Sequence, residues 1–366
     1  MNKSVLTILL SLMMGCAISS DPAPFEVEEI SSFNEPWSMT FLPDGDILIT
    51  EKSGRLILTN QNGAKNIEVQ GLPNVAYGGQ GGLGDVIIHP DFEKNKVVYL
   101  SFAEEGEEDT RGAAVIKAEL NIKSDSARLS DIKYIWRQIP KVTGKGHYAH
   151  RMRFSPDGYL FISSGDRQKF DPAQDMQMNL GKILRLNDDG TIPMDNPFVD
   201  QEGVAAEVWS LGHRNPLGID FDADGQLWNV EMGPKGGDEL NRVIMGENYG
   251  YPIVSNGRHY NMQDIPDHDT RPEFEAPKEW WTPVISPSAF EIYEGDLFSE
   301  WKGDGFVTGL SSKSLVQIKF MGSSAKEVRR FDMGKRIRSV VEGPNGALWL
   351  LEDKSGGRLL KLTPSL

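Results

Sequence analysis

The sequence is poor in cysteine and in positive charge. Cys16 is the one cysteine in 366 residues, which rules out an intramolecular disulfide. The 38 Lys and Arg residues are outnumbered by 53 Asp and Glu residues, so the formal net charge is -15. Nucleic acid and anionic membrane surfaces repel such a chain, and we expect neither as a partner. Small neutral molecules and cations remain open as ligands.

Long apolar stretches are absent beyond residue 20, and no long amphipathic helix is evident. The first 20 residues combine a basic start, an apolar run and small residues, a pattern that predicts an export signal over residues 1–15. This segment is too short to span a bilayer as a mature helix. We therefore expect the mature protein to work in the periplasm or cell envelope.

Cys16 follows Gly15 at the end of the predicted signal, where it resembles the lipidated cysteine of a bacterial lipobox. Met13 departs from that pattern, because leucine is usual there. We expect a lipid anchor at Cys16, with ordinary periplasmic secretion and a buried structural cysteine as the alternatives. Residues 16–24 would then form a short linker before a single domain over residues 25–366.

Several familiar motifs are also absent. No G-x-S-x-G elbow, Walker loop or C-x-x-C pair occurs, and "NDDGTIPMDNPF" lacks the closing Glu of an EF-hand. Residues 79–84 formally match G-x-G-x-x-G, but a strand and a turn follow them where a dinucleotide-binding fold needs a helix. Hydrolysis by an activated serine and a Rossmann fold therefore have no support.

The chain is rich in a short repeat that consists of an apolar residue, a tight turn of the Pro-Asp-Gly kind and an alternating strand. Clear copies have turns centred on Asp44, Asp157, Asp224 and Asn345, and weaker copies are centred on Asp91 and Ser288. Successive turns are 47 to 67 residues apart, which leaves room for four short strands and their loops.

These copies predict an all-β fold, a six-bladed β-propeller of four-stranded antiparallel blades. We expect the ring to be closed by pairing the strand after Pro24 with the C-terminal "GRLLKL". A β-sandwich is the alternative, although one sandwich rarely needs so many near-equal units.

Polar residues gather at the predicted entrances of strands. The stretch "GKGHYAHRMRF" places His147, His150 and Arg151 just before an inner strand. A zinc site would need a third ligand with matching spacing, and the sequence has none. A histidine in a loop can face an open site and titrates near neutral pH. His147 is therefore a candidate general base, with a structural histidine as the alternative.

Basic and amide side chains at other strand entrances suit an anionic ligand. Arg214 and Asn215 could bind a carboxylate or carbonyl oxygen, or could cap neighbouring backbone instead. Arg336 and Arg338 are two residues apart and would share one face of a strand, which suggests a polyanion; a solvated pair is the alternative. Gln80 is the one side chain of the glycine-rich stretch with hydrogen-bonding reach toward the axis.

The loop "EMGPKGGDELN", residues 231–241, combines glycine and proline with Asp238 and Glu239. Such a loop can turn carbonyl oxygens to one side and add anionic oxygens, both of which are ligands that calcium prefers. The sequence therefore favours a calcium site here, with a surface turn of solvated acids as the alternative.

Seven segments follow one another along nearly the whole mature chain: "PWSMTFLPDGDILITEKSGRL", "GGQGGLGDVIIHPDF", "GHYAHRMRFSPDGYLFISSGD", "NLGKILRLNDDGTIPMDNPF", "EVWSLGHRNPLGIDFDADGQLW", "EMGPKGGDELNRVIMGENYGYP" and "RIRSVVEGPNGALWLLED". Together they resemble the glucose/sorbosone dehydrogenase family, the soluble quinoproteins that include bacterial aldose sugar dehydrogenases. The resemblance implies a six-bladed propeller that holds pyrroloquinoline quinone (PQQ) and calcium near its axis. It also implies oxidation of the anomeric hydroxyl of an aldose to a lactone.

The resemblance further implies a role for each candidate residue. His147 corresponds to the general base and Arg214 to the residue that stabilises charge on the quinone oxygen. Contacts to PQQ, which carries three carboxylates, correspond to Gln80, Asn215, Arg336 and Arg338. The cofactor calcium corresponds to the carbonyl groups of Gly233 and Pro234, and a second, structural calcium corresponds to Glu239 with the Tyr249 carbonyl.

Two positions depart from the family pattern. Ser311 stands where a cofactor-binding Lys often follows the Leu that corresponds to Leu310, and Lys313 lies two residues later. Strand alternation would keep Lys313 on the same face, so we expect it to substitute as a cofactor contact. Ala149 stands where glycine is common and would narrow the site slightly.

Two other functions stay open beside the dehydrogenase. A calcium-dependent lactonase would need several carboxylate and Asn side chains around an axial calcium, whereas the basic cluster suits an anionic cofactor. A non-catalytic binding propeller without the cofactor is supported by Ser311. No motif identifies the electron acceptor, although the export signal points to the respiratory chain or a periplasmic carrier.

Overall fold

The computed structural model describes residues 23–365. The predicted export signal at residues 1–15, Cys16 and most of the predicted linker at residues 16–24 lie outside the described residues, so these remain predictions. Within the described range, no helix has the length and hydropathy needed to cross a membrane.

Strands dominate the described chain, and each of them belongs to one of five sheets. Four of these sheets are antiparallel and four-stranded. In strand order they are β1 (Phe25–Asn34), β25 (Ser355–Pro364), β24 (Leu348–Glu352) and β23 (Ile337–Glu342); β11 (Ala149–Phe154), β12 (Leu160–Ser164), β13 (Lys182–Leu186) and β14 (Val208–Leu211); β15 (Pro216–Phe221), β16 (Leu227–Glu231), β17 (Asp238–Arg242) and β18 (Glu279–Trp281); and β19 (Pro287–Ile292), β20 (Gly305–Gly309), β21 (Ser314–Met321) and β22 (Ser324–Asp332).

The fifth sheet contains nine strands. They are β2 (Pro36–Phe41), β3 (Ile47–Glu51), β4 (Arg55–Thr59), β5 (Asn66–Gln70), β9 (Ala127–Arg137), β8 (Thr110–Ile122), β7 (Val97–Glu105) and β6 (Leu83–Ile88), with β10 (Val142–Thr143) paired to β8. Its two antiparallel groups, β2 to β5 and β6 to β9, join through a short parallel pairing of β5 with β9. Each group has the same up-and-down order as the other sheets. Short helical turns are α1 (Phe92–Asn95), η1 (Asp171–Ala173), η2 (Gly203–Glu207), η3 (His268–Thr270) and η4 (Ser299–Trp301).

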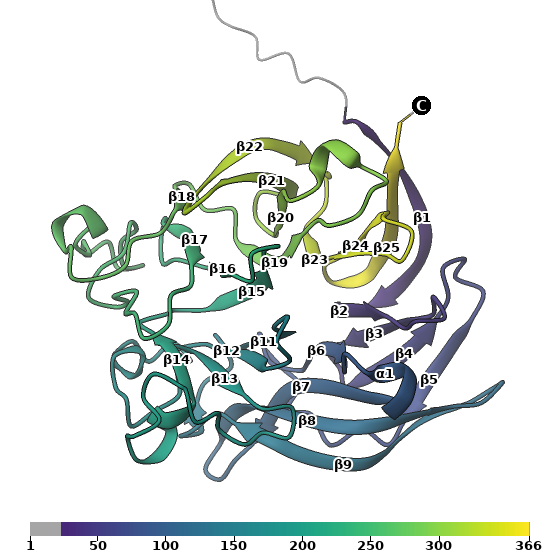
Figure 1. Cartoon of the computed structure of the whole chain (residues 1–366), viewed down its shortest axis with the longest axis horizontal. Helices are drawn as coiled ribbons and strands as arrows, with labels where there is room; N and C mark the ends of the chain where they lie inside the picture. The colour runs from purple at the N-terminus through teal and green to yellow at the C-terminus, as the bar shows by residue number, and fades with distance from the viewer. Residues whose placement is uncertain (1–22, 366) are drawn as a thin grey trace, which may run out of the picture.

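The sheets are arranged around a common centre, with β2, β6, β11, β15, β19 and β23 innermost (Figure 1). The prediction of an all-β fold built from four-stranded antiparallel sheets is confirmed, and the arrangement is the one expected of a propeller. The pairing of β1 with β25 runs from Phe25 opposite Pro364 to Asn34 opposite Ser355. The predicted closure between the two ends of the domain is therefore confirmed.

Four of the predicted turns connect the first and second strands of a group. They are the turns centred on Asp44, Asp157, Asp224 and Asn345. In each turn a glycine N–H donates to the carbonyl three residues earlier, as from Gly45 to Leu42 at 2.9 Å and from Gly158 to Ser155 at 2.9 Å. The repeated sequence thus marks the C-terminal ends of four innermost strands, β2, β11, β15 and β23.

The two weaker copies of the repeat differ from this pattern. Asp91 precedes α1, so a helical turn connects β6 with β7 there. The predicted turn at Ser288 is wrong, because Ser288 lies within β19. Pro287 opens that strand, a position where its missing N–H costs no ladder hydrogen bond.

The second strand of each group lies between neighbouring layers. Five such strands, β3, β12, β16, β20 and β24, are buried along their whole length. On β3, Leu48 packs into one hydrophobic cluster and Ile49 into another, because successive side chains point to opposite faces of a sheet. Packing between sheets therefore supplies the core, and the innermost strands can carry polar residues.

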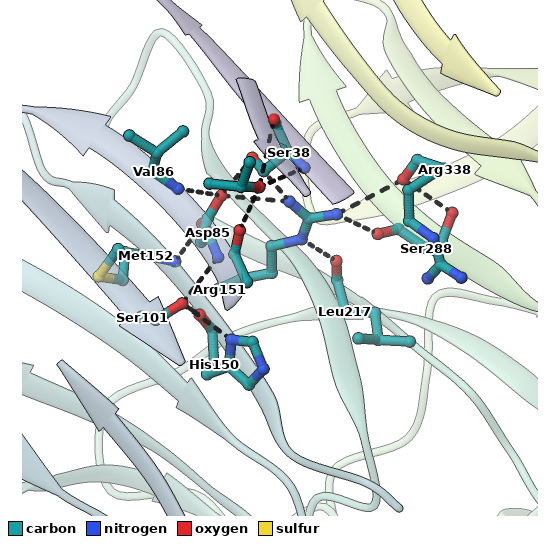
Figure 2. A network of polar contacts seen from close by, with 12 residues as sticks. Ser38, Asp85, Val86, Ser101, His150, Arg151, Met152, Leu217, Ser288 and Arg338 are labelled. Carbon is teal, nitrogen blue, oxygen red and sulfur yellow. Dashed lines mark hydrogen bonds and ion pairs between the residues drawn. The ribbon is translucent and has the colours of Figure 1, made fainter. Parts of the chain in front are cut away.

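Arg151, on β11, lies where the innermost strands converge (Figure 2). Its guanidinium donates to the carbonyls of Leu217 on β15, at 2.8 Å, and Ser288 on β19, at 2.6 Å. It also donates to Ser38 Oγ on β2 and pairs with Asp85 Oδ1 on β6, each at 3.2 Å. One side chain thus links five of the innermost strands.

The sixth innermost strand, β23, also reaches this guanidinium. The carbonyl of Arg338 lies 3.5 Å from Arg151 Nη2, and Trp37 packs with its ring centre 3.9 Å from the guanidinium carbon. Burial lowers the pKa of Arg151 to about 10, so the group keeps its charge at neutral pH.

Glu207, at the end of η2, is a carboxyl group held by neutral donors. Its Oε1 accepts hydrogen bonds from Asn179 Nδ2 at 2.6 Å and from Trp136 Nε1 at 3.2 Å. Burial raises the pKa of Glu207 to about 7. The native state therefore binds the Glu207 proton more tightly than the unfolded chain does. The protonated carboxyl group contributes its full stability below the ordinary pKa of Glu, and this contribution is lost as the pH rises through 7.

We expect Glu207→Gln to leave the free energy of unfolding nearly unchanged at pH 5 and to raise it by about 1–2 kcal/mol at pH 8. The amide oxygen of glutamine can accept both hydrogen bonds that reach Oε1, and no charge is buried at high pH. Urea denaturation at the two pH values measures the effect. An equal change at both pH values would contradict it.

Candidate active site and cofactor cavity

Two adjoining cavities contain most of the residues that the sequence singles out. The larger, of about 700 Å³, is lined by Gln80, Asn215, Arg336 and Arg338, the predicted cofactor contacts. The smaller, of about 260 Å³, is lined by His147 and Arg214, the predicted catalytic residues, and by Pro234. The two cavities are neighbours: Gln80 Oε1, in the lining of the larger, accepts a hydrogen bond from the backbone N–H of His147, in the lining of the smaller, at 2.7 Å, and Arg214 and Asn215 are consecutive.

The larger cavity has an excess of positive charge. Its ionised lining residues are Lys52, Arg336, Arg338 and Lys354 on the basic side and Glu35 and Asp353 on the acidic side. Arg336 Nε and Arg338 Nη2 both donate to Asp353, each at 2.7 Å, so the two arginines share a face as expected. Burial alone would raise the pKa of Asp353, but the two guanidinium groups hold it below its ordinary value. One carboxylate thus orients two cations and leaves a net positive charge for an anionic ligand.

His147 lies in the loop before β11 and is only 5% exposed. Its Nδ1 is 2.6 Å from Oδ1 of Asp166, a residue that follows β12. Backbone N–H groups of Gln168 and Phe170 donate to the same carboxylate at 3.1 and 3.2 Å and fix its position. Since the carboxylate holds Nδ1–H, Nε2 is the nitrogen available to accept a proton.

Burial lowers the pKa of His147 below its ordinary value, although the hydrogen bond to Asp166 opposes this shift. The imidazole is therefore neutral at pH 7, the state that a general base requires. Gly165 allows the two loops to meet, because a Cβ there would lie 2.1 Å from the His147 carbonyl oxygen.

Arg214 is held at the boundary of the two cavities. Its Nη1 donates to the carbonyls of Met232 at 2.8 Å and Gly233 at 2.6 Å. The backbone N–H groups of Arg214 and Asn215 both donate to Glu231 Oε2. Within the described chain, Arg214 Nε and Asn215 Oδ1 are buried without a hydrogen-bond partner. Buried polar atoms are normally paired, so these two atoms are open to a ligand.

The loop predicted to hold the cofactor calcium lies beside Arg214. Pro234 lines the smaller cavity, and the Gly233 carbonyl accepts from the guanidinium. The carboxylate of Asp238 is occupied by backbone N–H groups of Gly233 at 2.9 Å and Ser286 at 2.7 Å, and burial raises its pKa to about 6. Because backbone N–H groups occupy both Asp238 oxygens, the chain offers chiefly carbonyl oxygens here, and calcium, which takes six to eight oxygens, would need others from the cofactor and water.

The second predicted calcium site is a buried polar cluster between β16 and β17. Glu239, which is 7% exposed, lies directly opposite Glu231 in the strand register. Burial raises the pKa of Glu239, and the charge of Glu231 adds to this. Asn241 Oδ1 is buried nearby without a partner in the described chain. The ring of Tyr249 stacks on His213, which bonds to Glu231, whereas a calcium contact of the Tyr249 carbonyl remains a prediction.

Two opposed carboxylates and an unpaired amide oxygen suit a hard cation. Across residues 23–365, however, no group of three or more His, Cys, Asp or Glu side chains is arranged to hold a metal. Any calcium bound here would therefore depend on carbonyl and amide oxygens as well as on Glu239.

Lys313 is the one predicted cofactor contact that is not in the lining of either cavity. Residues 310–313 connect β20 to β21 through a bend and belong to neither strand, so the argument from strand alternation is wrong. The Lys313 side chain is exposed, whereas Leu310 lines the larger cavity and Ser311 Oγ bonds to Ser286 Oγ at 2.8 Å. A cofactor role for Lys313 remains a prediction.

Three acidic residues of the site were not identified from the sequence: Asp166, Glu231 and Asp353. Each lies at the end of the second strand of its group or just after it. The signal was present, because the repeats read "LFISSGD", "LWNVEMG" and "LWLLED". An acid at the same place in several copies of a repeat predicts that the acids face one end of the ring.

Comparison with protein-family models matches residues 33–361 to the family described as Glucose / Sorbosone dehydrogenase. The chain is also 35% identical over 373 residues to aldose sugar dehydrogenase YliI of Escherichia coli (strain K12), with 100% of each chain covered.

Two solved structures agree with this similarity. One is the crystal structure of the soluble aldose sugar dehydrogenase from Escherichia coli in the apo-form, with a TM-score of 0.87 and 36% identity over 93% of this chain and 100% of that chain. The other is the PQQ-bound form of aldose sugar dehydrogenase from Streptomyces coelicolor, with a TM-score of 0.77 and 26% identity over 94% of this chain and 99% of that chain.

Proposed function

The chain belongs to the glucose/sorbosone dehydrogenase family, as its sequence resemblance implied, and on this premise we propose that it oxidises the anomeric hydroxyl of aldose sugars to lactones with bound PQQ and calcium. The observation that carries the proposal is a positively charged cavity beside the buried His147–Asp166 pair. In a protein of net charge -15, four basic and two acidic groups line that cavity. An excess of cations suits a cofactor with three carboxylates.

The fit of PQQ to the larger cavity rests on this chain's own residues. A volume of about 700 Å³ lies within the usual range for small-molecule sites. Arg336 and Arg338 would bind carboxylate groups, and the unpaired Arg214 Nε, at the side of the smaller cavity, would donate to an anionic oxygen. The PQQ-bound structural neighbour supports the same assignment.

We also propose that the ring has six blades. Dividing the nine-stranded sheet at the parallel β5–β9 pairing yields two four-stranded groups, which join the four separate sheets. The convergence of six innermost strands on Arg151 supports this division.

Bound PQQ would supply an electrophilic carbonyl group that accepts a hydride from the sugar. His147 Nε2 would take the proton of the anomeric hydroxyl, while Asp166 holds Nδ1–H and stabilises the imidazolium. Arg214 would place a fixed positive charge at the boundary of the cavities and favour the build-up of negative charge there. Both side chains are buried, so these interactions are weakly screened by water.

The smaller cavity is the proposed sugar site. Beside His147 and Arg214, it is lined by the aromatic residues Phe170, Tyr251 and Tyr260. Aromatic faces pack against the C–H faces of a sugar ring, while a few polar groups orient its hydroxyls. The small volume suits one sugar ring held with its anomeric hydroxyl toward His147.

Calcium is proposed at two places, the carbonyl groups of Gly233 and Pro234 and the cluster around Glu239 and Tyr249. We further propose that the protein acts in the periplasm or cell envelope, anchored through Cys16, and passes electrons to a respiratory or periplasmic carrier.

The proposal is tested by titrating the metal-free protein with PQQ, with calcium or with a calcium chelator, and by following dye reduction by several aldoses. We expect saturable activity that requires both calcium and PQQ. PQQ binding without turnover on any aldose would contradict the substrate class and leave the cofactor site intact. No PQQ binding with calcium present would overturn the proposed function and favour a binding protein without the cofactor.

A further inference from the structure

His150 is a histidine of the larger cavity that the proposed reaction does not use. It lies on β11, is only 1% exposed, and lines the cavity together with Gln80, Asn215 and the two arginines. Figure 2 shows its ring beside Ser101, on the side of the polar network away from Leu217 and Ser288. A buried imidazole in a cavity wall either fills space or binds what enters the cavity.

The backbone is strained in a way that places this ring. His147, Ala149 and His150 have φ angles of 50°, 55° and 53°, a left-handed region that non-glycine residues rarely adopt. The β11–β12 pairing shifts register between Ala149 and Met152, which identifies an irregularity at His150. A left-handed backbone at three of four consecutive residues is held by the surrounding structure, and it sets the direction of the His150 side chain.

The ring itself is fixed from two sides. It stacks on Trp37 with 5.0 Å between ring centres and 17° between the planes. On another side it lies against the backbone of Gly84, where a Cβ would be 1.8 Å from His150 Cε1. Any other residue at position 84 would displace the ring, so the imidazole has one orientation.

Hydrogen bonds around Ser101 determine which nitrogen carries the proton. Ser101 Oγ accepts the Asp85 backbone N–H at 2.8 Å and lies 2.8 Å from both the carbonyl oxygen and Nδ1 of His150. The single hydroxyl proton goes to the carbonyl, which accepts only, and Nδ1–H then donates to the remaining lone pair of Oγ. This arrangement satisfies all four groups and leaves Nε2 with a lone pair.

Nε2 is the open hydrogen-bonding atom of this ring. Within residues 23–365, no hydrogen bond to it is found. Burial lowers the pKa of His150 to about 3, and the neighbouring Arg151 charge acts in the same direction, so the ring stays neutral at any physiological pH. A neutral acceptor in a cavity rich in cationic donors recognises a hydrogen-bond donor on the ligand.

Resting on the proposed function, we infer that His150 is a cofactor-binding residue whose Nε2 accepts a hydrogen bond from PQQ. The carboxylates and carbonyls of oxidised PQQ are acceptors, and its pyrrole N–H is the donor that it offers. The arginines would bind the anionic groups of PQQ. His150 would fix the orientation of the bound PQQ, because its lone pair accepts the pyrrole N–H, a donor that a cationic side chain cannot bind.

Three substitutions separate this role from space filling. Phenylalanine keeps an aromatic ring against Trp37 but has no nitrogen. Asparagine places a polar group where Nδ1 lies, within reach of Ser101, but leaves nothing at Nε2. Glutamine reaches the Nε2 position and can accept a hydrogen bond there.

The experiment measures the dissociation constant of PQQ for the full chain in calcium without sugar, by equilibrium titration of intrinsic fluorescence. Loss of one hydrogen bond should raise the dissociation constant about 5- to 10-fold in His150→Phe and His150→Asn, and by less than about 3-fold in His150→Gln. Thermal melting of each variant without PQQ establishes that it is folded. If the phenylalanine variant does not fold, the asparagine and glutamine pair still decides the question.

The inference is overturned if native, Phe and Asn proteins bind PQQ equally, or if all three variants lose the same affinity, which would indicate a space-filling role. Failure of the native chain to bind PQQ is a different result. It would overturn the proposed function and remove the premise of this inference.

Discussion

Replacing His147 with glutamine is expected to lower kcat for aldose oxidation by at least ~100-fold, because a positioned general base typically contributes that much or more. Glutamine can still accept or donate a hydrogen bond but cannot take a proton at Nε2. The backbone N–H that binds Gln80 is unchanged, so the larger cavity should still bind PQQ. Steady-state kinetics and a PQQ titration on the same preparation measure the two effects.

The matched control is His259→Gln, which alters the other histidine of the smaller cavity. That variant should keep kcat within about 10-fold of native, because no carboxylate orients His259 as Asp166 orients His147 in the described chain. Native kcat/KM should also remain on its plateau down to below pH 6.5, since burial lowers the pKa of His147. Unchanged turnover in His147→Gln would remove His147 from the mechanism.

The repeated strand-turn pattern was sufficient to predict the class of fold. Turns such as those at Asp44 and Asp157 are local structures, and their sequence dictates them wherever the chain lies. The pairing of β1 with β25 was predictable for a different reason, since a ring of sheets must protect its last edge. Ser288 shows the limit, because Pro-Ser at the start of a strand has the same composition as a turn.

Residues near the site were predictable where their type alone restricted their chemistry. Arginines two apart in an acidic protein pointed to an anionic ligand, and Arg336 and Arg338 do line one cavity. Lys313 was assigned by counting positions along an assumed strand, but residues 310–313 form a connection with a bend, where side chains do not alternate between two faces. A face can be predicted from alternation only if the strand itself is established.

Long-range partners were the part that the sequence could not supply. Asp166 is 19 residues from His147, and Asp353 is 17 and 15 residues from Arg336 and Arg338. Each acid can pair with its basic partner because the second strand of a group ends beside the start of the first strand. That geometry follows from the register of β11 with β12 and of β23 with β24, which hydrophobic periodicity does not specify.

Arg151 is the clearest case of a role that only the three-dimensional structure reveals. Its contacts reach from Ser38 to Arg338, a range of 300 residues, and no local pattern distinguishes it from Arg153 two positions later. Arg153 instead pairs with Asp220 on β15 and Glu291 on β19. Arg151 and Arg153 are two residues apart on β11 and so share one face, but the sequence does not distinguish the arginine that contacts every innermost strand.

Replacing Arg151 with methionine is expected to lower the free energy of unfolding by roughly 3–5 kcal/mol, because it removes one partner of a buried ion pair. Asp85 would keep its backbone donors, such as the Met152 N–H at 2.8 Å, but its charge would be buried without a cation. The carbonyls of Leu217 and Ser288 would also lose their side-chain donor. Methionine retains the length of the side chain, so the change tests charge and hydrogen bonding more than volume.

Urea denaturation of a double-mutant cycle measures this effect and assigns its cause. Asp85→Asn in the Arg151→Met background should recover at least ~1 kcal/mol, since the amide removes the unpaired charge. Arg258→Met is the matched control, because Arg258 forms an exposed ion pair with Asp264 and should change stability by less than about 1 kcal/mol. If Arg151→Met and Arg258→Met had equal effects, the central guanidinium would not stabilise the ring. If the two substitutions at Arg151 and Asp85 were additive, their charges would not be coupled, and the stabilisation by Arg151 would have to come from its bonds to the carbonyls of the innermost strands.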